Sequence, residues 1–266
     1  MNKTVGEAEE TAKALREQLQ ALSDVEVAVC PPATALDAVG KALKGSEIAL
    51  GAQDLFWEEK GAYTGLISPL MLKDVGCKYV IIGHSERRGR FGKPDPSLTP
   101  ELKTVFGDND STVNRKAEAA LAHGLRPIIC VGETLQEWEE KKTDTVVSGQ
   151  LKKAIAGLKI ETGEELVIAY EPVWAINTGK ICDPPEANRI IGMMRQVLQD
   201  CLGEEAAGKI RILYGGSVDP QNAEKIMRQS EIDGVLVGGA SLQAEKFSVI
   251  VSAAKTQKES ESSRLN

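Results

Sequence analysis

Short apolar runs alternate with helical patterns along most of the chain, and this alternation limits the folds that it can adopt. Each run is rich in β-branched residues and is followed by glycine, proline or a polar residue. The seven runs are Val25–Cys30, Ile48–Ala52, Tyr79–Ile82, Pro127–Val131, Leu166–Tyr170, Ile210–Tyr214 and Gly234–Val237. Continuous apolar strands separated by helices predict an α/β protein with a parallel sheet buried on both faces. An open doubly wound sheet and a closed (β/α)8 barrel both satisfy this pattern.

The segments between the runs carry apolar residues every three or four positions, as amphipathic helices do. Thr4–Leu22, Lys142–Leu158 and Glu186–Leu202 show this period, and Asp219-Pro220 is typical of a helix start. The pattern therefore begins on a helix and contains seven strands. An eight-stranded barrel needs one more strand, which would be the first.

Composition agrees with a single barrel and excludes several classes of protein. The chain has 266 residues, of which 42 % are apolar and 27 % charged, and a single α/β barrel has about 250 residues. The net charge of −7 argues against binding to nucleic acid or to a membrane surface, since both usually require a basic face. We predict one domain over residues 1–255 and a polar C-terminal tail over 256–266. The stretch from Gly89 to Asp110 is predicted to be a long surface loop with one helical turn.

The cysteines and the chain start indicate the cytoplasm. The five cysteines are odd in number and widely spaced, without a C-x-x-C pair, which is typical of reduced thiols. The first residues lack an apolar signal segment, and no apolar run approaches the roughly 18 residues that span a bilayer. With His84 and His123 as the only histidines, we expect no metal site.

Glycine pairs follow the last two predicted strands. Gly215-Gly216-Ser217 ends one strand and Gly238-Gly239 ends the next. Chemistry collects at the carboxyl ends of parallel strands, and the loops after the last two strands of such barrels often bind phosphate. One such turn alone is ordinary turn geometry, but the adjacent pair favours a phosphate site.

His84 and Glu171 each follow a predicted strand, so both are expected at the same edge of the sheet. An imidazole and a carboxylate in one cavity can share proton transfer. The alternative is a buried structural histidine and a helix-capping glutamate. His123 precedes Gly124 and is predicted to end a helix. Because no lysine stands at a strand end, Schiff-base chemistry is disfavoured, which leaves metal-free acid–base chemistry on a small phosphorylated substrate.

Several motifs together resemble the triosephosphate isomerase family, from Met1 to about Lys255. They are the segments Glu171–Lys180 (EPVWAINTGK), His84–Arg88 (HSERR), Tyr214–Val218 (YGGSV), Val237–Ser241 (VGGAS), Gly61–Gly65 (GAYTG) and Cys130–Thr134 (CVGET). The resemblance implies a (β/α)8 barrel without a cofactor. It also implies interconversion of dihydroxyacetone phosphate and D-glyceraldehyde 3-phosphate through an enediolate, in glycolysis and gluconeogenesis.

The resemblance assigns roles to individual residues. Glu171 would be the base, and His84 a neutral electrophile whose pKa is held low by a helix N-terminus. Residues 172–180 would form a mobile lid. The phosphate would be held by main-chain groups of Asn177, Ser217 and Gly239, with Gly238 beside them. Supporting positions are Asn2, Ser85, Glu86 and Thr64, the last in a loop that reaches the neighbouring subunit of a homodimer.

The sequence departs from the family pattern at its start. The family's first strand ends in Asn-Trp-Lys-Met-Asn, whereas this sequence begins at the Met of that motif, so the first strand and the substrate-binding lysine are missing from it. Our hypothesis is that an internal Met was taken as the start, which the codons upstream would test. The alternative is an impaired or inactive barrel that retains phosphate or partner binding.

Three smaller departures concern loops. Asn177 stands where the lid has Gly, and Leu66 where the dimer loop usually has Glu. Phe91-Gly92 recurs as Phe106-Gly107, so we interpret residues 91–105 as an insertion. A tolerated surface insertion is favoured over a partner-binding segment.

Overall fold

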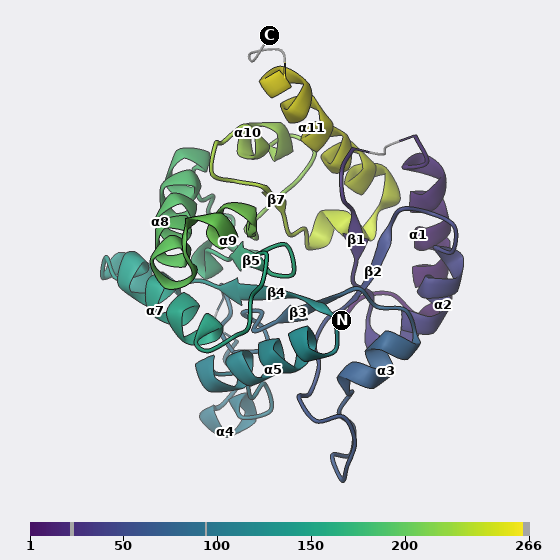
Figure 1. Cartoon of the computed structure of the whole chain (residues 1–266), viewed down its shortest axis with the longest axis horizontal. Coiled ribbons are helices and arrows are strands. Elements are labelled where there is room, and N and C mark those ends of the chain that lie inside the picture. The colour runs from purple at the N-terminus through teal and green to yellow at the C-terminus, as the bar shows by residue number, and fades with distance from the viewer. Residues whose placement is uncertain (22–23, 94, 263–266) are drawn as a thin grey trace.

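The computed structural model describes residues 1–21, 24–93 and 95–262. Its seven strands form one parallel sheet in the order β1-β2-β3-β4-β5-β6-β7, which curls into an incomplete barrel (Figure 1). The strands are β1 (Ala28–Val29), β2 (Ala49–Ala52), β3 (Tyr79–Ile82), β4 (Arg126–Val131), β5 (Val167–Tyr170), β6 (Arg211–Tyr214) and β7 (Gly234–Val235). Within the described residues, β1 and β7 are the two edges of this sheet. The predicted α/β barrel class and the positions of all seven strands are confirmed.

Helices surround the outer face of the sheet (Figure 1). The longer ones are α1 (Val5–Gln18), α5 (Asp110–Ala122), α7 (Thr143–Ile155), α8 (Pro184–Leu202) and α11 (Ala244–Ser262). The shorter ones are α2 (Leu36–Ala42), α3 (Pro69–Asp74), α4 (Pro100–Lys103), α6 (Leu135–Glu139), α9 (Glu204–Lys209) and α10 (Ala223–Met227), with 3-10 turns η1 (Ala33–Ala35), η2 (Val173–Ala175) and η3 (Gly239–Leu242). No helix in the part of the chain that the structure describes is long and apolar enough to cross a membrane.

Both faces of the sheet are buried, which explains why the strands are continuously apolar. On β4, Ile128 and Cys130 belong to a small cluster built only from strand residues and their neighbours. Ile129 and Val131 belong to the large cluster that also contains residues of the surrounding helices. Successive side chains of a strand point to opposite faces. The small cluster therefore fills the concave side of the sheet, and the large one joins the sheet to the helices.

One predicted helix start is corrected by the structure. The helix expected to start at Asp219-Pro220 begins instead at Ala223, because the Asp219 carboxylate first caps a turn by accepting from the N–H groups of Gln221 (2.8 Å) and Asn222 (3.0 Å). After His84, residues 85–89 form overlapping turns, in which the N–H groups of Arg87 and Arg88 donate to His84 O at 2.8 and 3.1 Å. At the other end of the chain, α11 continues to Ser262, so part of the predicted tail (256–262) is helical, and 263–266 lie outside the described residues. The helical turn expected in the Gly89–Asp110 loop is confirmed as α4.

Candidate active site

The side chains of His84 and Glu171 meet at the carboxyl ends of β3 and β5. His84 Nε2 lies 2.9 Å from Glu171 Oε1, and the other ring nitrogen, Nδ1, accepts the backbone N–H of Glu86 at 3.2 Å. Since Nδ1 is an acceptor, the neutral imidazole carries its proton on Nε2 and directs it towards Glu171. The two residues that the sequence placed at one edge of the sheet are thus in direct contact.

Glu171 is buried and held by the turn that carries His84. The Ser85 N–H donates to Glu171 Oε2 at 3.0 Å, and the Ser85 hydroxyl lies 3.4 Å from Oε1. The Glu171 side chain is only 2 % exposed, so these contacts replace water around the carboxylate. Ser85 thus contacts Glu171 through both its backbone N–H and its hydroxyl.

The pKa of His84 differs from the sequence expectation. Burial lowers the pKa of the imidazole, but the carboxylates of Glu171 and Glu86 together raise it by more. The net pKa lies above its ordinary value, not below it. The described segment after His84 forms overlapping turns rather than an α-helix, with the N–H groups of Arg87 and Arg88 donating to His84 O at 2.8 and 3.1 Å. Glu171 is therefore the main charge that raises the pKa of His84 in this arrangement.

Glycines at two neighbouring strand ends leave room for Glu171. A Cβ on Gly132, after β4, would lie 1.7 Å from the Glu171 carbonyl oxygen, and a Cβ on Gly215, after β6, would lie 3.1 Å from Glu171 Cγ. Gly215 N–H also donates to Tyr170 O at 2.7 Å. The sequence suggested Gly215 only as part of a phosphate loop and gave Gly132 no role. Their closeness to Glu171 follows from the parallel register of β4, β5 and β6.

Arg88 links the ends of two neighbouring strands next to the site, a role that the sequence analysis did not predict. Its side chain is 7 % exposed, and Nη1 pairs with Asp110 at 2.9 Å. Nε donates to Gly83 O at 2.7 Å and Nη2 to Cys130 O at 3.3 Å. The guanidinium thus joins the end of β3, which carries His84, to β4. The sequence signal for this role was the arginine that ends the HSERR motif, His84–Arg88.

The predicted lid leaves β5 directly after Glu171 and is attached at several points. Trp174 Nε1 donates to Glu133 Oε1 at 2.7 Å, and the Thr178 hydroxyl donates to Trp174 O at 2.7 Å. The Ser217 hydroxyl donates to Ala175 O at 3.0 Å, which joins the lid to the loop after β6. Asn177 is exposed and has φ +56°, a left-handed conformation that suits glycine and, among other residues, asparagine best.

Glu133 is a second buried carboxylate that sequence reasoning quoted but did not explain. It is fully buried, and its Oε1 also accepts from the Tyr170 hydroxyl at 3.1 Å, while Oε2 has no hydrogen-bond partner within the described residues. Burial raises the pKa of Glu133, and the hydrogen bonds from Trp174 and Tyr170 oppose that rise. The carboxylate connects β5 to the first turn of the lid.

The other predicted binding residues lie on loops of neighbouring strands. Ser217 follows β6, and Gly238 and Gly239 follow β7, which pairs with β6 in the sheet. Asn2 lies in the exposed segment before α1, and Thr64 in an exposed turn of the loop between β2 and α3, which projects from the body in Figure 1. Among the described contacts, neither Asn2 nor Thr64 touches His84 or Glu171. His123 ends α5, as predicted, with Nδ1 2.8 Å from Ala119 O.

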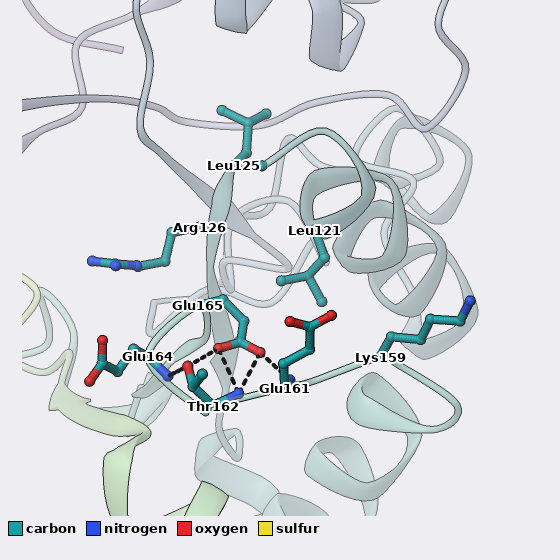
Figure 2. A pocket seen from close by; sticks show the side chains of 9 residues that line it. Leu121, Leu125, Arg126, Lys159, Glu161, Thr162, Glu164 and Glu165 are labelled. Atoms are coloured by element: carbon teal, nitrogen blue, oxygen red, sulfur yellow. Dashed lines mark hydrogen bonds between the residues drawn. The ribbon is translucent and has the colours of Figure 1, made fainter.

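A cavity of about 480 Å³ lies at the opposite end of the sheet (Figure 2). It is lined by Arg126, the first residue of β4, and by Glu165, which precedes β5. Burial raises the pKa of Glu165, but hydrogen bonds from Thr162 and from backbone N–H groups outweigh it and lower the pKa to about 2. Figure 2 shows that this carboxylate bonds within its own turn, with the Thr162 hydroxyl at 2.7 Å. The Glu165 carboxylate is therefore satisfied within its own turn, and the cavity is separate from His84 and Glu171. Nowhere in the described ranges do three or more His, Cys, Asp or Glu side chains gather to hold a metal ion.

Comparisons with known proteins agree with the geometry. The family model for triosephosphate isomerase matches residues 1–254. A triosephosphate isomerase of Endomicrobium trichonymphae is 48 % identical over 255 residues, which cover 96 % of this chain and 96 % of that protein. One of Carboxydothermus hydrogenoformans is 48 % identical over 251 residues, covering 94 % of each chain. The crystal structure of triosephosphate isomerase from Bartonella henselae is 36 % identical, with a TM-score of 0.81 over 96 % of this chain and 95 % of that one.

Proposed function

The chain belongs to the triosephosphate isomerase family, and from this membership we propose how its residues interconvert dihydroxyacetone phosphate and D-glyceraldehyde 3-phosphate. It is an isomerase that acts on triose phosphates, a step shared by glycolysis and gluconeogenesis. The observation that carries the residue assignment is the contact between His84 Nε2 and Glu171 Oε1 at 2.9 Å, with Nδ1 of His84 already occupied. None of the described contacts favours an inactive barrel.

Glu171 is the base of the proposed reaction. Its carboxylate takes the proton from the hydroxymethyl carbon of dihydroxyacetone phosphate and later returns it to the neighbouring carbon. His84 donates from Nε2 to the carbonyl oxygen, so the negative charge of the enediolate forms beside a hydrogen-bond donor. The substrate must replace the direct His84–Glu171 contact, which places its two reacting carbons and their oxygens between the two side chains.

The phosphate would be bound by main-chain N–H groups of Ser217, Gly239 and Asn177, with Gly238 beside them. Glycine allows close approach of the backbone, and successive N–H groups form a site for anions. The Ser217 hydroxyl already joins the β6 loop to the lid through Ala175 O at 3.0 Å. This contact supports a lid that closes over the same phosphate and excludes water from the enediolate.

The test is isomerisation in D2O with a coupled assay and mass analysis of the product. The wild type should incorporate deuterium at the carbon next to the carbonyl, because Glu171 exchanges its proton with solvent. Glu171→Gln should lower kcat by about 10³-fold or more and abolish incorporation. Ser85→Ala, which leaves the carboxylate in place, should retain activity within about tenfold. Full activity of Glu171→Gln would refute the assignment.

We further propose a cytoplasmic homodimer. The loop between β2 and α3 and the helix that follows it expose the apolar side chains Tyr63, Leu66, Leu70 and Met71, which are 44–58 % exposed. Thr64 lies in the same loop, and exposed apolar clusters mark interaction surfaces. All five cysteines are free, as expected of a reducing compartment. Sedimentation equilibrium should give a dimer, and Met71→Glu should shift it towards monomer. A monomeric wild type would contradict this proposal.

A further inference from the structure

Trp138 of α6 contacts both ends of the lid. Its ring stacks on that of Trp174, with centroids 4.5 Å apart and planes inclined by 25°. Lys180 Nζ lies 5.7 Å from the Trp138 ring centroid. Trp174 belongs to the first turn of the lid and Lys180 is its last residue. A single indole, outside the proposed active site, therefore bridges the two points at which the lid joins the barrel.

The turn that carries Trp138 is anchored. Thr134 begins α6 in a capping box, in which its backbone N–H and hydroxyl donate to Glu137 Oε2 at 2.7 and 2.9 Å. The same carboxylate pairs with Arg90, which follows the turn that starts at His84. Trp138 is the next residue after Glu137, so its backbone is tied to the segment that presents His84.

Contacts with Trp138 differ in strength between the two ends of the lid. The Trp174 ring is 5 % exposed and is held both at its edge, by the hydrogen bond to Glu133, and at its face, by Trp138. Lys180 is exposed and Trp138 is 38 % exposed, so solvent weakens their cation–π contact more than it weakens stacking on the buried Trp174 ring. The Trp174 end of the lid is therefore held more firmly than the Lys180 end. The cation–π contact with Trp138 restricts the position of Lys180.

We propose that Trp138 is a positioning residue. It holds the two ends of the lid, Trp174 and Lys180, in the positions from which the lid closes over the substrate phosphate. This inference rests on the proposed function. With both ends held, fewer lid conformations have to be lost when the lid closes, so more of the phosphate's binding energy is available to the reaction. The effect should be confined to substrates that carry the phosphate, because only these engage the lid.

The first experiment compares glyceraldehyde 3-phosphate with glyceraldehyde, which has the same reacting atoms and no phosphate. In Trp138→Ala, kcat/KM for the phosphorylated substrate should fall by about tenfold, and that for glyceraldehyde should change by less than about twofold. Trp138→Phe keeps an aromatic face and should recover most of the loss. Lys180→Met, which keeps the stem without the charge, should lose about threefold. Equal losses with both substrates would overturn the proposal, since a general structural defect would act on both.

The second experiment does not require activity. Amide hydrogen exchange of the peptide that covers residues 172–182 should be at least about threefold faster in Trp138→Ala than in the wild type. Exchange in α1, which packs against α2 and α11, serves as the control and should be unchanged. Unaltered exchange in the lid would overturn the proposal, whether or not the wild type is active. An inactive wild type with faster lid exchange in Trp138→Ala would instead refute the proposed function and leave the positioning role in place.

Discussion

The protonation of His84 is set by burial, which lowers its pKa, and by the carboxylates of Glu171 and Glu86, which together raise it above its ordinary value. A histidine whose pKa is raised in the folded state contributes stability that is complete below its unfolded pKa of about 6.5. That contribution is lost as the pH rises through the folded pKa. At low pH the His84–Glu171 ion pair is therefore at its strongest, and the carboxylate proposed as the base is engaged. kcat/KM should accordingly fall as the pH drops through the raised pKa of His84.

Glu171→Gln should lower the pKa of His84. The substitution removes the carboxylate charge that raises this pKa, whereas burial, which lowers the pKa, is unchanged. NMR titration of the ring resonances measures this directly. The chain has two histidines, so His123→Gln provides the assignment. An unchanged or higher pKa of His84 in Glu171→Gln would show that another group sets its protonation.

Substitutions of Asn177 test whether the lid requires a left-handed backbone conformation at this position. Its φ of +56° costs glycine nothing and asparagine little, but a β-branched residue is strongly disfavoured there. Asn177→Gly should keep kcat/KM within about twofold, whereas Asn177→Val should lose about tenfold, since strain of about 1–2 kcal/mol would depopulate this lid conformation. Steady-state kinetics of the two variants checks this. Equal activity of both would mean that the lid works without a left-handed residue at this position.

At the scale of elements, the 91–105 segment resembles a duplicated loop. Phe91 and Phe106 pack edge to face with centroids 5.1 Å apart, and Asp108 N–H donates to Arg87 O at 3.0 Å, so the two ends of the segment already lie together. A Cβ on Gly92 would lie 2.2 Å from Ile176 O, so this glycine packs directly against the lid.

Deletion of residues 91–105 joins Arg90 to Phe106-Gly107 and restores the same Phe-Gly pair at the lid. We expect a folded enzyme with kcat/KM within about threefold of the wild type, because shortening a surface loop changes the closure entropy little. Circular dichroism and the coupled assay measure the two properties. Loss of activity in a folded variant would instead show that residues 91–105 contribute to the reaction.

Helix boundaries show where sequence reasoning is weakest. Asp219-Pro220 carries the expected start signal, yet α10 begins at Ala223, because the Asp219 carboxylate is used by the preceding turn. The α7 and α8 helices lie close to their predicted ranges, since apolar periodicity over many residues is a stronger signal than a cap.

At the scale of the whole molecule, a polar cluster joins the amino ends of distant strands. Glu26, just before β1, accepts hydrogen bonds from Tyr79 on β3 and from Arg211 on β6, and pairs with Arg126 on β4 at 3.1 Å. Glu26 and Arg211 are 185 residues apart in sequence. The cluster thus connects opposite sides of the curled sheet.

Glu26→Gln should destabilise the protein in a pH-dependent way. Burial raises the pKa of Glu26, but the hydrogen bonds from Tyr79 and Arg211 outweigh it, so the net pKa is lowered. A lowered carboxylate pKa contributes stability above the unfolded value of about 4.3, which is lost as the pH falls through the folded pKa. Because Glu26 is half exposed, solvent screening limits the loss at pH 7 to about 1 kcal/mol.

Urea unfolding at pH 7 and near pH 3 measures this loss. The difference between wild type and Glu26→Gln should shrink at the acid pH. Glu9→Gln is the control, because Glu9 pairs only with exposed Lys13 one helical turn away, and it should cost less than about 0.5 kcal/mol. A pH-independent loss in Glu26→Gln would exclude the charge as the cause.

The sequence by itself determined the strands, their parallel arrangement and the loops that carry the chemistry. These features depend on local patterns, since a strand buried on both faces must be continuously apolar and its end must turn at a polar or glycine residue. The motifs around His84 and Glu171 also determined the family.

Only the tertiary structure decided how those loops meet. The 2.9 Å contact of His84 with Glu171, the crowding of Gly132 against Glu171 and the stacking of Trp138 on the lid each join residues far apart in sequence. Their distances depend on the register and curl of the sheet, which no local pattern specifies. The family resemblance implied a lowered pKa for His84, whereas the structure pairs His84 with Glu171 and the pKa is raised.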